Sequence, residues 1–80
     1  MKVTVIVTIK PSIPDPQGQT ICRFLSSIGI TYITGLRQGK IFLFDIKDEL
    51  PLKERQKQVH RLAKEVLTNP VYEEYRIIWK

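Results

Sequence analysis

The 80-residue sequence has only one cysteine and one histidine, Cys22 and His60. A single cysteine excludes an intramolecular disulfide, and two potential ligands are too few for a structural zinc site, which needs about four. A chain this short buries only about 60–65% of the surface of its unfolded state. Because neither a disulfide nor a metal can reinforce so small a core, we expect the domain to gain stability by associating with other chains.

The sequence also lacks a long hydrophobic run. No segment approaches the roughly 20 consecutive apolar residues of a membrane span. The apolar residues of Val3–Ile9 alternate with threonine, in a segment too short for the hydrophobic part of a signal peptide. We therefore expect a single domain over residues 1–80, located in the cytoplasm and without a membrane partner.

Acidic residues are fewer than basic ones, 8 against 13, which gives a net charge of +5. One predicted helix contains five of the basic residues and only two acidic ones; the basic residues are Lys53, Arg55, Lys57, Arg61 and Lys64. Such a cluster can bind nucleic acid or an acidic partner. It is also typical of a solvated helix face, on which Arg61 and Glu65 form an i,i+4 pair. We favour the solvated face.

A proline-rich corner separates the first predicted strand from the first predicted helix. Lys2–Lys10 alternates between two faces and is rich in β-branched side chains, which predicts a strand. Asp15 can cap a helix, and Pro16 suits its first position. Apolar residues at i, i+3, i+4 and i+7 then predict a helix over Pro16–Ile28, and Gly29 follows where a left-handed cap is needed.

The remainder of the chain alternates between strand and helix patterns in the same way. Ile30–Leu36 and Lys40–Lys47 are predicted strands, joined by a tight hairpin at Arg37-Gln38-Gly39. A helical stripe follows over residues 51–67. Alternation over Val71–Trp79 predicts a final strand.

The element order β-α-β-β-α-β predicts an α+β fold, a ferredoxin-like plait with a four-stranded antiparallel sheet and two helices on one face. The side chains expected to meet the helices are Val3, Val5, Val7, Phe42, Phe44 and Tyr75. The other face then presents aliphatic side chains at Ile6, Ile33, Ile41, Leu43 and Ile78. Because an exposed apolar sheet face needs a cover, we expect a homo-oligomer, a dimer or a tetramer, that associates through it.

The sequence offers few groups for catalysis. Cys22 lies near the start of the first predicted helix, but the single possible base, His60, lies on the other helix. Asp15 is explained by capping, while Asp45 and Asp48 are typical of solvated carboxylates at the end of a strand. A glycine-rich phosphate loop is absent. We therefore expect no catalytic residue, no bound cofactor and no metal site in this chain.

Two other classes of protein share this topology. The segment Arg37–Phe44 has the basic, glycine and aromatic pattern of an RNA-recognition motif. The first strand offers no aromatic side chain to stack on a base, however, and Phe42 and Phe44 are expected in the core, so we expect no nucleic-acid partner. A regulatory module of the ACT type, which binds small molecules, shares the topology and remains an alternative.

Three segments at their observed spacings resemble the PurS family, the small subunit of phosphoribosylformylglycinamidine synthase. They are Lys10-Pro11-Ser12-Ile13-Pro14-Asp15-Pro16-Gln17-Gly18, Leu36-Arg37-Gln38-Gly39-Lys40 and Leu67-Thr68-Asn69-Pro70-Val71-Tyr72-Glu73-Glu74-Tyr75-Arg76-Ile77. The resemblance extends to the length and element order of nearly the whole chain.

The resemblance implies a role in purine biosynthesis. Members of the family assemble with a glutaminase subunit and a large synthetase subunit into a ligase that uses ATP and glutamine. The small subunit would have no catalytic residue; it would bridge the other two subunits and assist ammonia transfer, with ATP and magnesium bound by the large subunit. Candidate contacts with these partners come from the corner, the hairpin and the final strand: Asp15, Gln17, Arg37, Lys40, Glu73, Tyr75 and Arg76.

Overall fold

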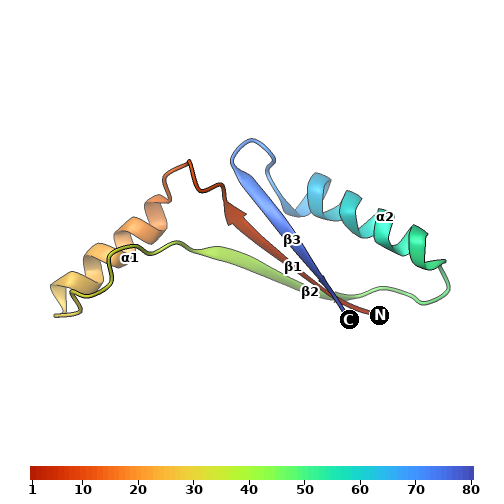
Figure 1. Cartoon of the computed structure of the whole chain (residues 1–80), viewed down its shortest axis with the longest axis horizontal. Helices are drawn as coiled ribbons and strands as arrows, with labels where there is room; N and C mark the ends of the chain where they lie inside the picture. Colours follow the sequence, from red (N-terminus) through yellow and green to blue (C-terminus); the bar gives the residue numbers. More distant parts are fainter.

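The computed structural model describes residues 1–80 as three strands and two helices (Figure 1). In chain order the elements are β1 (Lys2–Ile9), α1 (Pro16–Ser27), β2 (Gly39–Asp45), α2 (Leu52–Leu62), a π-helical turn η1 (Ala63–Leu67) and β3 (Glu73–Trp79). The strands form one antiparallel sheet in the order β2-β1-β3. Neither helix is long and apolar enough to cross a membrane.

The register of the central strand β1 decides which side chains share a face. Val5 lies opposite Phe42 on one side and Ile77 on the other. The next residue, Ile6, lies opposite Ile41 and Arg76. Because side chains alternate along a strand, the first set faces α2 and the second set faces away from it.

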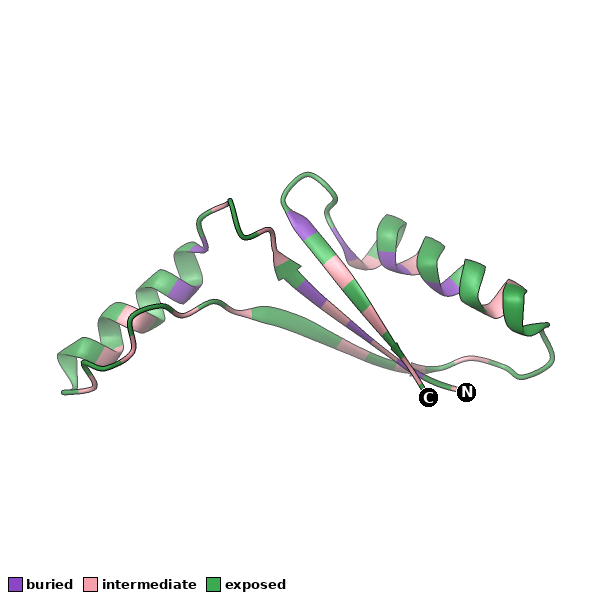
Figure 2. Ribbon diagram, in the orientation of Figure 1, coloured by how far each residue is buried: buried purple, intermediate pink, exposed green.

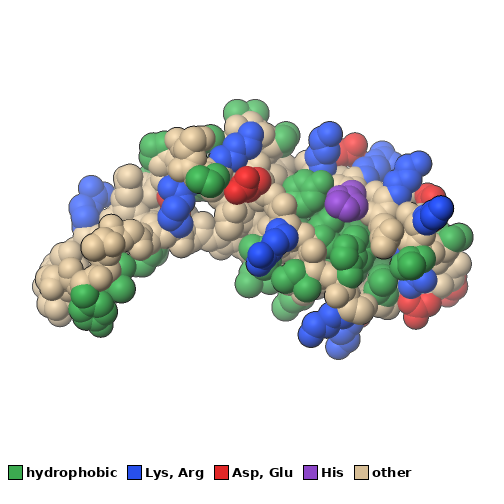
Figure 3. Space-filling model, viewed as in Figure 1, with side chains coloured by type: hydrophobic (Ala, Val, Ile, Leu, Met, Phe, Trp, Pro, Cys, Tyr) green, Lys and Arg blue, Asp and Glu red, His purple; other side chains and the backbone are tan.

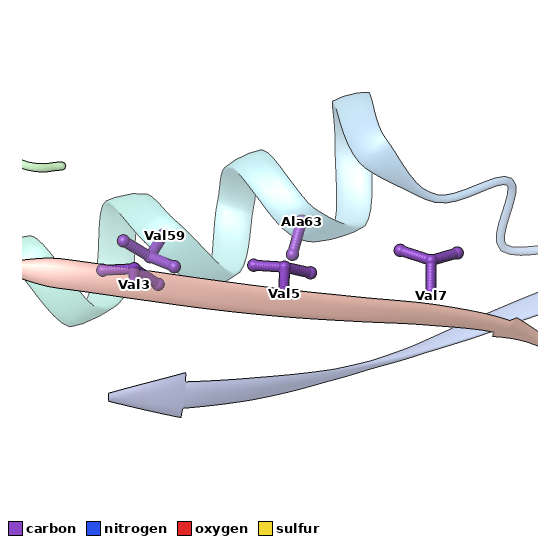
Figure 4. Close-up of a cluster of buried hydrophobic side chains, with 5 residues drawn as sticks. All are labelled: Val3, Val5, Val7, Val59 and Ala63. Carbon is purple, nitrogen blue, oxygen red and sulfur yellow. The ribbon is translucent and has the colours of Figure 1, made fainter. Parts of the chain in front are cut away.

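The core lies between β1 and α2. Val3, Val5 and Val7 point from the strand toward Val59 and Ala63 on the helix, and all five are at most 1% exposed (Figure 4). Half-buried side chains surround them, among them Phe42, Phe44, Tyr75, Ile77 and Trp79. The predicted core of the sheet is therefore confirmed, with α2 as its cover.

Helix α1 has the local signals that the sequence predicts. Asp15 is its N-cap and accepts a hydrogen bond from the amide of Gly18, and Pro16 occupies the first turn. At the other end Gly29 has φ 92°, and the amide of Ile30 donates to the carbonyl of Leu25, which closes the helix. The two ends of this helix therefore follow from local chemistry.

Helix α1 nevertheless lies away from the sheet. With residues 28–38, which run back alongside it, α1 forms an arm that projects from the sheet and α2 (Figure 1). The radius of gyration is 16.4 Å and the extents are 52 × 24 × 14 Å. A compact domain of this length has a radius of gyration of about 12 Å. The chain by itself is therefore extended, and Figure 2 shows the arm mostly exposed.

The predicted four-stranded plait is correct in class and wrong in two details. Residues 30–36 form no strand, and the chain passes through Arg37-Gln38-Gly39 without a hairpin, since Gly29 is the one residue with positive φ. Only α2 covers the sheet, so the two helices do not share its face. Ile33 consequently lies off the sheet and beside α1, where its carbonyl is 3.6 Å from the Cys22 thiol. The edge of β2 that would have paired with residues 30–36 is free.

Candidate assembly interface

The corner between β1 and α1 is built around a buried carboxylate. Asp15 is 2% exposed, and its two oxygens accept hydrogen bonds from different segments. Oδ1 accepts from the amide of Gly18 at 3.0 Å, and Oδ2 accepts from the amide of Gln38 at 2.8 Å. These amides, Gln38 foremost, hold the pKa of the Asp15 carboxyl below its ordinary value of 3.8, and the charge of Arg37 acts in the same direction against burial. Asp15 is thus an ionised link between α1 and the segment before β2.

The close approach of residues 36–38 to α1 requires a glycine at position 18. A Cβ built on Gly18 would lie 2.4 Å from the carbonyl oxygen of Leu36 and 2.8 Å from Asp15 Oδ2. Any side chain there would push the two segments apart. Gly18 therefore belongs to the same junction as Asp15, because only a residue without a side chain leaves room for the Leu36 carbonyl.

Arg37 joins the two chain segments that cross from the sheet to the arm. Its Nη2 lies 2.7 Å from the carbonyl oxygen of Ile13, 3.1 Å from that of Lys10 and 3.4 Å from that of Ile9. The guanidinium group thus contacts the end of β1 and the loop that leads to α1. Beside it, the side chains of Gln17 and Gln38 are hydrogen-bonded to each other.

A polar depression continues from this junction onto the sheet. Gln17, Gln38, Lys40 and Glu73 line a cavity of about 320 Å³ together with four other residues. Glu73 is 8% exposed; one oxygen accepts from the amide of Asn69 at 2.8 Å, and the other lies 3.6 Å from Lys40 Nζ. In this ion pair the Lys40 side chain is largely exposed to solvent, whereas the Glu73 side chain is buried.

The fold brings most of the predicted contact residues together. Asp15, Gln17, Arg37, Lys40 and Glu73 meet at the junction between arm and sheet. Tyr75 lies on the face that α2 covers, with its hydroxyl 3.4 Å from His60 Nδ1. Arg76 lies on the opposite face, across from Ile6. No pattern in the sequence predicts the role of the Gln38 amide, because a backbone group leaves no signature in the residue type.

The arm exposes an apolar stripe. On α1 and its C-cap residue Ile28, Phe24 is 62% exposed, Ile28 56% and Ile21 39%. Figure 3 shows hydrophobic side chains exposed at the end of the arm. The sequence predicts these side chains as the buried stripe of an amphipathic helix, so their exposure marks a surface that lacks its partner.

The face of the sheet opposite α2 is a second apolar surface. Leu43 is 75% exposed, Ile41 64% and Ile78 38%, and Ile6 lies on the same face opposite Ile41. No aromatic side chain lies on this face; Phe42 and Phe44 face α2. An RNA-recognition motif needs aromatic side chains to stack on bases, and this sheet does not present them.

No cluster of three or more histidine, cysteine, aspartate or glutamate side chains with the geometry of a metal site is present. His60 lies on α2 beside Tyr75 and Trp79, whereas Cys22 lies on the arm. The basic side chains of α2 are mostly exposed, and Arg61 pairs with Glu65 at 3.0 Å. The fold and its surfaces together define a small α+β chain that is suited to association with other chains. The surfaces that suit it are the exposed apolar stripe of the arm, the apolar face of the sheet and the polar junction between them.

Comparison with known proteins identifies this class more closely. Residues 2–80 match the PurS family, described as phosphoribosylformylglycinamidine (FGAM) synthase. A Mycobacterium leprae protein named phosphoribosylformylglycinamidine synthase subunit PurS is 36% identical over 76 residues, which cover 95% of this chain and 91% of that protein. A Methanocaldococcus jannaschii protein of the same name is 34% identical over 78 residues, 95% of this chain and 90% of its own.

Solved structures agree with the sequence relatives. PurS of B. subtilis is 32% identical and superimposes with a TM-score of 0.85, over 96% of this chain and 94% of that one. A chain of the PurLQS structure from Thermotoga maritima is 30% identical, with a TM-score of 0.83 over 96% and 93% of the two chains. The chain belongs to the PurS family, and the resemblance found in the sequence is confirmed. It is a subunit type of FGAM synthase in purine biosynthesis.

Proposed function

We propose that this chain is the non-catalytic bridging subunit of FGAM synthase, which binds the glutaminase subunit and the large synthetase subunit and assists ammonia transfer between them. ATP and Mg²⁺ bind to the synthetase subunit in this proposal. The observation that supports it best is the combination of family and surface: the chain has the PurS fold, yet more than half of Phe24, Ile28, Ile41 and Leu43 is exposed. The PurLQS structure from Thermotoga maritima contains a chain similar to this one, which supports a role within a complex.

The arm and the sheet suggest how two copies associate. In a closed plait, residues 30–36 would pair with the free edge of β2, and α1 would cover the sheet beside α2. In this chain, residues 30–36 and α1 instead project together away from the sheet, as the arm. A second copy has the same free edge and the same uncovered surface, so each arm can complete the sheet of the other copy. Such an exchange is isologous and closes as a dimer.

The apolar face opposite α2 remains open after this exchange. Its side chains, Ile6, Ile41, Leu43 and Ile78, provide a flat aliphatic surface of the kind that packs against another sheet. We assign it to a second contact between copies, which would turn two dimers into a tetramer. Ile33 belongs to the arm in this arrangement.

The polar junction is left for the other subunits. Gln17 and Lys40 present exposed polar or charged groups at this junction, and Lys40 is oriented by Glu73; Arg76 presents its charge on the opposite face of the sheet, beside Ile6. Asp15 and Arg37 support this surface through their hydrogen bonds to the backbone, whereas Tyr75 lies under α2 beside His60. The rim of a non-obligate interface is polar, and these side chains can provide such a rim.

Reconstitution tests the proposal. FGAM formation is measured with the purified glutaminase and synthetase subunits, with glutamine and then with an ammonium salt as nitrogen source, in the presence and absence of this chain. We expect synthesis from glutamine to fail without the chain, while synthesis from ammonia continues. Full synthesis from glutamine by the other two subunits alone would refute the bridging role.

A further inference from the structure

The two connections between arm and sheet determine whether the arm is open or closed. One is the loop from Ile9 to Asp15, and the other is the segment from Leu36 to Gly39. To close onto its own sheet, the chain would have to turn back at Arg37-Gln38-Gly39. A tight two-residue turn there needs positive φ values, and the observed backbone has none at these residues.

Two polar side chains hold the connections in this open arrangement. Arg37 lies in the second connection and donates to carbonyl groups of the first, at Lys10 and Ile13. Asp15 lies at the end of the first connection and accepts from the amide of Gln38 in the second. Each connection thus supplies one charged group to the backbone of the other. Hydrogen bonds to charged groups are among the stronger ones in proteins.

The tight packing of the backbone adds to this arrangement. Gly39 begins β2 opposite Thr8, and a Cβ at Gly39 would lie 2.4 Å from the carbonyl oxygen of Val7. The chain from Gln38 into β2 is therefore held flat against β1 from its first residue. A reverse turn at this point would have to break the hydrogen bond from Gln38 to Asp15.

We propose that Asp15 and Arg37 form a hinge clamp that keeps the arm open and so selects the arm-exchanged dimer over a self-closed monomer. The sequence alone is compatible with the closed plait, because residues 30–36 and 40–47 both have strand patterns. The clamp favours the form that must find its apolar cover on a second copy. This inference rests on the arm exchange proposed above.

The clamp acts by pre-organisation. If the free chain divides its time between open and closed forms, and both copies must be open to exchange arms, the apparent dissociation constant of the dimer rises in inverse proportion to the square of the open fraction. Loss of one hydrogen bond to a charged group is expected to raise that constant by about tenfold or more. The same loss would speed the exchange of copies between dimers, because a loose hinge lets an arm leave and return.

The test compares the full-length chain with Arg37→Ala and Asp15→Asn, using Arg61→Ala as the matched control. Arg61 lies on α2 and pairs only with Glu65, far from the hinge along the chain. Sedimentation velocity across a dilution series gives the dissociation constant, and fluorescence transfer between labelled copies gives the exchange rate. We expect weaker dimers and faster exchange for both hinge variants and no change for Arg61→Ala.

The outcomes separate the two proposals. A wild-type chain that is monomeric at high concentration refutes the arm exchange, and the clamp with it. A dimeric wild-type chain with an unchanged constant and rate in both hinge variants refutes the clamp alone. If a hinge variant is unfolded by circular dichroism, insertion of Asn-Gly between Gln38 and Gly39 replaces it, since that pair favours the tight turn. An insertion variant that dimerises like wild type also refutes the clamp.

Discussion

The carboxylate of Asp15 accepts a hydrogen bond from the backbone amide of Gln38 at 2.8 Å, although 23 residues separate them along the chain. The same carboxylate caps α1 through Gly18. One side chain therefore links the start of the helix to the segment that enters β2. Its position in the sequence, before a proline at a helix start, explains only the first of these contacts.

The first prediction concerns pH. Because the folded state lowers the pKa of Asp15 below 3.8, the stabilisation that this group provides is fully present above the unfolded pKa and is lost as pH falls through the folded one. Wild type should exceed Asp15→Asn in free energy of unfolding near pH 7. The difference should shrink below about pH 4, as measured by urea unfolding at a series of pH values. A constant difference across this range would contradict the prediction.

The second prediction concerns Gly18. Its substitution by alanine places a methyl group against the Leu36 carbonyl and should destabilise the chain by about 1–3 kcal/mol, the usual cost of overpacking. Gly35→Ala is the matched control, because a Cβ there would meet nothing within 4 Å and φ is not positive. That change should be neutral or stabilise by up to about 1 kcal/mol. Urea unfolding of the two variants at one protein concentration distinguishes these cases.

The third prediction concerns the arm. Phe24→Asp puts a charge into the stripe that the second copy would bury, and the dimer dissociation constant should rise at least about thirtyfold, as for loss of a hot-spot side chain. Gln19→Asp introduces the same side chain on the opposite side of α1 and should leave the constant unchanged. Dilution series by sedimentation velocity measure both. Equal constants for the two variants would place the dimer contact elsewhere.

The fourth prediction concerns the open face of the sheet. Leu43→Lys adds a charge to a side chain that is 75% exposed in the single chain and should stop association at the dimer. Lys57→Glu changes the charge of the basic face of α2 and should preserve the tetramer, since we regard that face as solvated. Light scattering after size-exclusion chromatography gives the mass of each. A tetramer that survives Leu43→Lys would remove this face from the interface.

Local signals in the sequence predict most elements correctly. Alternation along Lys2–Lys10 predicts β1, and the Asp15-Pro16 cap and Gly29 predict both ends of α1 within one or two residues. The second helical segment ends at Leu67 as expected, and β3 begins two residues later than predicted. In each case the interaction that fixes the element lies within a few residues of the chain.

The prediction fails where the structure of a segment depends on a partner that is distant along the chain or on another copy. Residues 30–36 have the pattern of a strand, yet a strand exists only where another strand pairs with it, and the arm carries them away from β2. For the same reason, the stripe of Phe24 and Ile28 correctly predicts an apolar face but not the surface that covers it. A hydrophobic pattern predicts that a face is buried, but it does not predict whether the same chain or another one covers that face.

The candidate site shows the same division. The register places Ile6, Ile41, Leu43 and Ile78 on one face, as alternation predicts. The meeting of Asp15 with Gln38 and of Arg37 with three carbonyl groups depends on backbone atoms, which leave no pattern in the sequence. Contact of these residues with a glutaminase subunit and a synthetase subunit remains a prediction.

The two ends of the chain lie side by side at the end of the sheet remote from the arm (Figure 1). The amide of Lys80 donates to the carbonyl of Lys2 at 3.2 Å, and Val3 pairs with Trp79. A short peptide could therefore join the ends without moving a strand, so the chain suits circular permutation and tandem fusion. A purification tag or fluorophore at either end would likewise lie away from the arm and leave its apolar stripe free.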